Sequence, residues 1–214
     1  MNKERLLPLT GVLFVVLLFI GFAIAGEPPD ADEDVQEIID HYVDKKDAIW
    51  VSTGFFLAAA LSLLFFASYL RRLFSDAEGR TSLLPGLILV GASMITLGGA
   101  IDGTIMLALA EAAEDIEPSA VQALQALWDN DFLPIALGGL VFLLSVGLAT
   151  LKTGLLPKWL GWVAIALVVL GFTPIGFVAF IGMIVIIVIA SIILAVRAGR
   201  ATTPPATTPP AARP

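Results

Sequence analysis

Five stretches without a charged side chain divide the chain: 6–26, 48–70, 81–101, 132–151 and 159–196. The hydrocarbon core of a bilayer, about 30 Å thick, is crossed by roughly 20 residues of α-helix. The last stretch is long enough for two spans, and Thr173-Pro174-Ile175-Gly176 within it is typical of a tight turn. The pattern predicts an all-α, polytopic transmembrane bundle of six spans, at about 6–26, 48–70, 83–110, 132–151, 157–173 and 176–196.

The short segments between these stretches differ in lysine and arginine content, which orients a membrane protein because basic loops stay in the cytoplasm. With the N-terminus inside, only Lys45 and Lys46 fall on the outer side. The other basic residues fall on cytoplasmic segments: Lys3, Arg5, Arg71, Arg72, Arg80, Lys152, Lys158, Arg197, Arg200 and Arg213. The chain is therefore predicted to be a multi-pass protein of the bacterial cytoplasmic (inner) membrane with both termini in the cytoplasm.

The first stretch has two interpretations. Residues 1–5 form a short basic segment in the cytoplasm, and an apolar run follows, as in an uncleaved membrane anchor. Ala23-Ile24-Ala25 before Gly26 also matches the small-residue cleavage pattern of a secretory signal peptide. We expect an anchor; cleavage would leave five spans and keep the other loops on their sides.

Two segments on the predicted outer side are amphipathic. In 30–48 apolar residues recur at helical spacing, and Asp30 followed by Glu33 suits an N-terminal cap. In 118–130 a second short helical pattern begins at Pro118. We expect short external helices whose apolar positions pack on the bundle: Val35, Ile38, Ile39, Tyr42, Val121, Leu124, Leu127 and Trp128. These helices belong to two external cap segments, 27–47 and 111–131.

The C-terminal residues 198–214 contain the five-residue sequence Ala-Thr-Thr-Pro-Pro twice in succession. Repeats of proline, threonine and alanine cannot bury a core, so this segment is predicted to be a disordered cytoplasmic tail. Four tryptophans are predicted to anchor the bundle at the membrane surfaces, where the indole N–H can remain hydrated. Trp50 and Trp128 fall near the outer surface, and Trp159 and Trp162 near the inner one.

Composition excludes several classes of protein. The chain is 58% hydrophobic and 14% charged, whereas a soluble domain is about a quarter charged. The net charge of −7 supplies no basic face for nucleic acid. There are no cysteines and one histidine, which excludes disulfides, thiolate sites and any site that needs two imidazoles. No cofactor or metal site is predicted.

The fifth predicted span begins within 154–162, GLLPKWLGW, where a proline, a basic residue and two tryptophans combine. Together with GVLFVV at 11–16 and LRRL at 70–73, this sequence resembles a family of bacterial six-span membrane proteins known as a domain of unknown function. The resemblance covers 6–197. It implies a six-helix inner-membrane fold, no particular activity, and an acidic residue in the third span, where Asp102 stands. The Pro/Thr tail and the acidic first loop depart from the family pattern.

Asp102 is the one acidic side chain within the predicted spans. Because a carboxylate at the middle of a membrane helix costs about 2.5–3.5 kcal/mol, it is expected to face the bundle interior. Gly99 and Gly103 form a small-residue pattern that would let another helix approach. Two interpretations stay open: a protonatable or cation-binding transport site, or an anchor hydrogen-bonded to hydroxyls such as those of Thr53, Ser145 or Thr173.

No catalytic constellation is found in the sequence. One intramembrane carboxylate cannot form the acid pair of an aspartyl protease, and the external His41 cannot activate a serine inside the membrane. We therefore expect a non-enzymatic membrane interaction or structural protein. Its expected partners are membrane lipids and a protein partner or a second copy, with no nucleic acid. The alternative is a small permease or a proton- or cation-coupled carrier that uses Asp102.

Overall fold

The computed structural model describes residues 6–78 and 82–201. It is all-α, without a strand in those ranges. A short 3-10 helix, η1 (Leu7–Leu9), leads into α2. The α-helices are α2 (Thr10–Ala25), α3 (Val35–Asp44), α4 (Lys46–Glu78), α5 (Leu84–Ala112), α6 (Pro118–Asn130), α7 (Leu133–Thr153), α8 (Lys158–Gly171) and α9 (Phe177–Ala201).

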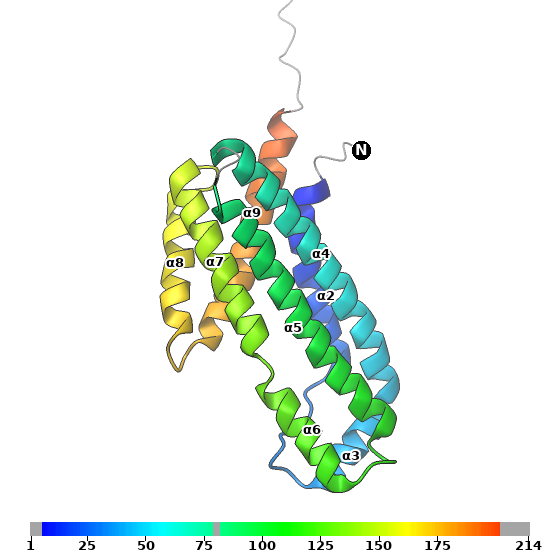
Figure 1. Cartoon of the computed structure of the whole chain (residues 1–214). Coiled ribbons are helices and arrows are strands. Elements are labelled where there is room, and N and C mark those ends of the chain that lie inside the picture. The colour runs from blue at the N-terminus through cyan, green and yellow to red at the C-terminus, as the bar shows by residue number, and fades with distance from the viewer. Residues whose placement is uncertain (1–5, 79–81, 202–214) are drawn as a thin grey trace, which may run out of the picture.

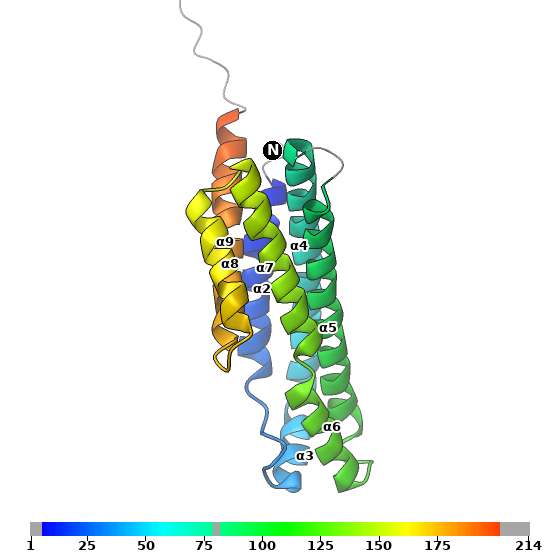
Figure 2. The ribbon, with the colours of Figure 1, turned by 60° about the vertical axis from the view of Figure 1, so that its left-hand side comes forward.

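The long helices form a bundle in which neighbours along the chain pack together. α2 packs on α4, α4 on α5, α5 on α7, α7 on α8 and α8 on α9, and α9 closes the bundle against α2. Figure 2 shows α7 between the α8–α9 pair and the α4–α5 pair. The main core lies along the bundle axis and contains Leu63, Phe66, Phe142, Met183 and Ile187, all almost fully buried.

Five helical segments in the described part of the chain are long and apolar enough to cross a membrane, as in a multi-pass membrane protein. They include α2 with η1, α4, α5, α7 together with α6, and α9. α8 has 14 residues, about 21 Å of helix, and falls short of the thickness of the hydrocarbon core. Helix length therefore supports five of the six predicted spans, and the prediction over 157–173 is not confirmed.

The ends of the described chain lie together, away from α3 and α6 (Figure 1). At that end Lys152 Nζ lies 3.0 Å from Glu78 Oε2, and the Arg197 guanidinium donates to the Leu155 carbonyl. α9 continues to Ala201, so the prediction of a disordered tail from residue 198 is wrong for 198–201. These four residues extend the last turns of an apolar helix. The rest of the predicted tail, 202–214, and the N-terminal segment 1–5 lie outside the described residues.

α3 and α6 build a small folded unit at the opposite end of the bundle (Figure 1). We call residues 27–45 and 113–131 the cap. The predicted helix over 118–130 is confirmed by α6. The predicted start of the other helix at Asp30 is wrong: α3 begins at Val35, and the Asp34 carboxylate accepts from the Gln36 N–H at 2.8 Å. The cap shares its own core with α4 and α5: Ile38, Tyr42, Ile49, Met106, Leu109 and Val121.

α5 and α7 run antiparallel and approach closely at three glycines. A Cβ atom built on Gly91 would lie 2.6 Å from the Phe142 nitrogen, and one on Gly138 would lie 2.7 Å from the Ile95 nitrogen. A Cβ on Gly98 would lie 3.0 Å from the Ile135 nitrogen. Backbone therefore meets backbone along this pair, as in membrane helices that associate through small residues.

Candidate functional site

Asp102 lies on α5, half-buried, near the end of the bundle that carries the cap. Its carboxyl group is within hydrogen-bonding reach of the carboxyl group of Asp131, which lies in the short turn between α6 and α7. Asp131 was not among the predicted site residues, because it falls outside every charge-free stretch. The predicted carboxylate of Asp102 is therefore one member of a pair, and this pair links α5 to the turn between α6 and α7.

The pair has an unusual hydrogen-bonding requirement. Asp131 Oδ2 is buried and has no hydrogen-bond partner in the described part of the chain. Two ionised carboxylates repel and contain no donor, whereas one proton held between two carboxyl groups supplies the missing donor. Chemically, the arrangement can hold a proton, and it places that proton between the bundle and the cap.

The predicted role of Gly99 and Gly103 is wrong. A Cβ atom built on either glycine meets no atom within 4 Å, so no neighbouring helix packs closely against them. The close approach of α5 to α7 uses Gly91 and Gly98 instead, which lie on the α5 face that meets α7. Small residues at this spacing indicate helix packing, but the spacing does not specify which face of the helix meets a partner.

The predicted hydroxyl partners of Asp102 are also wrong. Thr53 Oγ1 donates to the Ile49 carbonyl at 2.8 Å, and Ser145 Oγ donates to the Val141 carbonyl at 2.7 Å. Thr173 Oγ1 donates to the Leu170 carbonyl at 2.6 Å. Each hydroxyl has one proton to donate, and each donates it to the preceding turn of its own chain segment. A tether of Asp102 through these hydroxyls is therefore absent.

Next to the acid pair, a buried polar network holds the cap together. Tyr42 donates its hydroxyl proton to Gln125 Oε1 at 2.8 Å, and both side chains are fully buried. Gln125 Nε2 donates to the Pro29 carbonyl at 2.9 Å and to Asp129 Oδ1 at 3.0 Å. Asp129 Oδ2 accepts from the Ala31 N–H at 3.0 Å. Both N–H donors of the Gln125 amide and its carbonyl oxygen therefore have hydrogen-bond partners.

The electrostatics of the cap keep this network in one protonation state. Burial, assisted by the charges of Asp129 and Asp102, raises the pKa of Tyr42 well above its ordinary value. The phenol thus remains protonated and donates to Gln125 across the physiological pH range. Sequence analysis identified Tyr42 only as an apolar position and did not identify Gln125, because a glutamine in an amphipathic pattern is ordinarily solvent-exposed.

The tryptophans predicted as interface anchors have different environments. Trp50 is half exposed and donates its indole N–H to Glu111 Oε1 at 2.7 Å, and Lys46 Nζ lies 2.8 Å from Glu111 Oε2. Trp159 and Trp162 are exposed near the start of α8. Trp128 packs against the core of the cap, and its Nε1 is buried without a hydrogen-bond partner among the described residues. The prediction that the Trp128 N–H stays hydrated is therefore wrong.

A helix register explains how Asp102 meets Asp131. In an antiparallel pair, each step forward on one helix corresponds to a step backward on the other. The register that places Gly91 against Phe142 and Gly98 against Ile135 also places Asp102 against Asp131. The glycines were the available signal, but their pairing is visible only once α5 and α7 are docked.

No protein-family model, curated protein or solved structure matches this chain.

Proposed function

We propose that this chain is a non-enzymatic, multi-pass protein of the bacterial cytoplasmic membrane that binds a partner through its cap, on the outer side. The single observation behind the proposal is that the cap is a folded unit. Helix-to-helix connections in a bundle need about 2–8 residues, whereas the cap has its own core and a buried hydrogen-bond network around Gln125. A structure of this kind presents a defined surface, which a simple connection does not require.

The charge of the cap indicates the chemistry of that partner. The cap, residues 27–45 and 113–131, holds 13 of the 19 acidic residues of the chain and one basic residue, Lys45. Several carboxylates of α3 and the loop before it are solvent-exposed: Asp32, Glu33, Asp34, Glu37, Asp40 and Asp44. Electrostatic complementarity favours a partner with a basic surface. The basic residues gathered at the other end support a cytoplasmic position for both termini.

Neutralising the exposed acidic face of the cap is expected to abolish partner binding. The variant replaces Glu33 and Glu37 by Gln, and Asp40 and Asp44 by Asn. Cells that carry the native chain or the variant are treated with a membrane-impermeant amine crosslinker. The yield of the crosslinked partner should fall at least about fivefold, since the attraction between charged surfaces is lost. Asp76→Asn, an exposed acid at the other end of the molecule, should leave the yield unchanged. Equal yields from both variants, or no adduct from the native chain, would contradict the proposal.

The position of Asp131 favours a second function, a proton-coupled carrier. A half-buried carboxyl pair that holds a proton between a bundle and a cap resembles, in its chemistry, the carboxylate relays of membrane transporters. The relevant support is the contact between Asp102 and Asp131, together with the unpartnered Oδ2 of Asp131. This candidate and the first are separable, because the cap surface and the pair are different groups.

Asp102→Asn is expected to abolish proton movement while preserving the fold, because the Asn amide can still donate to Asp131. The measurement is proton entry into pyranine-loaded proteoliposomes driven by a potassium diffusion potential. Under the carrier hypothesis the native protein exceeds empty liposomes and Asp102→Asn does not. Asp115→Asn, an exposed residue in the loop between α5 and α6, should behave as native. Native flux equal to that of empty liposomes, or flux retained in Asp102→Asn, would exclude the carrier.

A further inference from the structure

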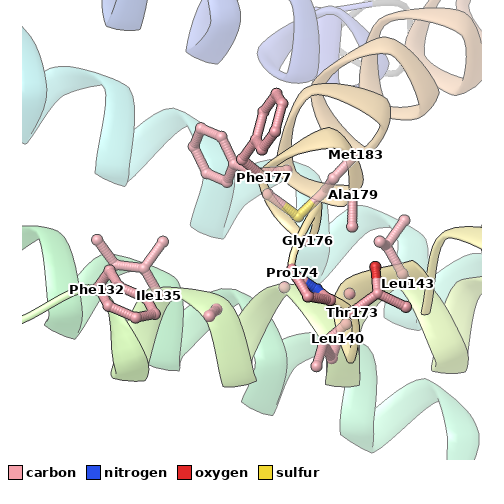
Figure 3. Close-up of a pocket in the computed structure, with 14 residues that line it drawn as sticks. Phe132, Ile135, Leu140, Leu143, Thr173, Pro174, Gly176, Phe177, Ala179 and Met183 are labelled. Carbon is pink, nitrogen blue, oxygen red and sulfur yellow. The ribbon is translucent and has the colours of Figure 1, made fainter. Parts of the chain in front are cut away.

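A cavity of about 570 Å³ lies between α7 and the hairpin formed by α8 and α9 (Figure 3). Thr173 contributes the one polar side chain of its lining, and that hydroxyl already donates to the Leu170 carbonyl. No lining residue carries a charge. The large lining side chains come from both walls: Phe132 just before α7, Ile135 and Leu140 on α7, and Phe177, Phe180 and Met183 on α9.

The cavity lies where α7 and the first turns of α9 separate. α9 packs against α8 and α2, while its first turns stand apart from α7. The turn from Thr173 to Gly176 is closed on itself, since the Gly176 N–H donates to the Thr173 carbonyl at 2.9 Å. Among the small residues of the lining are Ala136 on α7 and Ala179 on α9.

The tip of the α8–α9 hairpin is apolar, unlike a turn that lies in water. Phe172, Ile175 and Phe177 are 79%, 53% and 66% exposed. No charged residue occurs between 159 and 196. α8, which leads to the hairpin tip, has 14 residues and is about 21 Å long. A hairpin tip with this surface suits the hydrocarbon of a bilayer better than water, and the cavity beside it would then open to lipid.

Neither water nor empty space suits this cavity. A buried water needs two to four polar partners, and the lining has no free polar side chain. The carbonyls of Thr173, Ile175 and Gly176 already accept backbone hydrogen bonds. An empty cavity of this size would leave its walls without van der Waals contacts on one side.

We propose that the cavity binds one acyl chain of a membrane phospholipid. Its volume lies within the range of about 300–1,000 Å³ that is typical of small-molecule sites. Its rim is formed by aromatic side chains, with Phe132 57% exposed and facing the α9 wall across the gap in Figure 3. Phospholipid is the medium that surrounds the hairpin tip, and its chains match the charge-free lining. This site is separate from the cap surface and from the Asp102–Asp131 pair.

Photocrosslinking with a phosphatidylcholine that carries a diazirine midway along one chain tests the proposal. The full-length protein is reconstituted with this probe in phosphatidylethanolamine and phosphatidylglycerol, and adducts are mapped by peptide mass spectrometry. Adducts on cavity residues of α7 and α9 should exceed those on Leu57 and Leu61, exposed apolar residues of α4, by at least about fivefold. That ratio corresponds to roughly 1 kcal/mol of preferential binding.

Two variants that fill the cavity and one control variant at a neighbouring position complete the test. Ala136→Phe places a ring in the mouth of the cavity and should reduce cavity adducts to the level on Leu57 and Leu61. Ala179→Phe fills the cavity from α9 and serves if Ala136→Phe does not fold. Leu137→Phe, on an exposed position of α7 outside the lining, should leave the adducts unchanged.

Three results would overturn the proposal. The first is a native protein whose cavity adducts do not exceed those on α4. The second is a filling variant that keeps the native melting temperature and the native adduct yield. The third is a lipid-free dimer in native mass spectrometry together with a crosslink between two copies formed by a photoreactive residue introduced at position 177, which would show that a second copy occupies the cavity.

Discussion

Replacing Gln125 by Ala is expected to free the cap from the bundle while the spanning helices remain folded. The substitution removes the acceptor for the Tyr42 hydroxyl and the donor to the Pro29 carbonyl, and it takes one hydrogen bond from Asp129. Each buried polar group left without a partner costs about 1–3 kcal/mol. The cap should therefore lose about 3 kcal/mol of stability against local unfolding. Amide hydrogen exchange in α3 and α6 should then be roughly a hundredfold faster, since 1.4 kcal/mol is a factor of ten.

Two related variants show whether the buried network is responsible. Tyr42→Phe leaves only Gln125 Oε1 unsatisfied, so its effect on exchange should be smaller than that of Gln125→Ala. Gln122→Ala removes an exposed hydrogen bond to the Ala31 carbonyl, 3.1 Å long, and should cost about 0.5 kcal/mol. If Gln125→Ala and Gln122→Ala accelerate exchange equally, the buried network does not hold the cap.

Replacing Gly138 by Ala is expected to destabilise the whole bundle. The added Cβ alone would lie 2.7 Å from the Ile95 nitrogen and 2.8 Å from the Gly91 oxygen, and both are backbone atoms that no rotamer change can move. The helices must separate, which costs about 1–3 kcal/mol for overpacking and loses close contacts along the pair. We expect a clear fall in the melting temperature in detergent, followed by circular dichroism.

Gly99→Ala is the matched control, because the same methyl group is added to an open position of α5. A glycine within a helix is about 1 kcal/mol less favourable than alanine, so this variant should keep or raise the melting temperature. The opposite order, with Gly99→Ala the less stable of the two, would show that α5 and α7 do not meet at Gly138.

The positions of the helices could be predicted from the sequence, because hydropathy and capping are local properties. The spans over 83–110 and 132–151 and the helix over 118–130 agree with α5, α7 and α6 to within about two residues. Local patterns predicted the ends of the helices less reliably. The start of α3 moved from Asp30 to Val35, because Asp34 rather than Asp30 receives the N–H of the first turn.

The candidate site depended on docking, which no local pattern contains. Asp131 lies outside the charge-free stretches and 29 positions from Asp102, and only the register of α5 against α7 brings the two carboxyl groups together. The same register selects Gly91 and Gly98 and leaves Gly99 and Gly103 without a partner.

The sequence by itself determined that this is a helical membrane protein with an acidic segment at one end and basic residues at the other. The tertiary structure alone decided which carboxyl groups meet, that Gln125 is buried against Tyr42, and that a cavity remains between α7 and α9. The physical reason is the range of the interactions. Transfer of a side chain from water to lipid depends on that residue and its own helix, whereas a contact or a void depends on the relative positions of two helices.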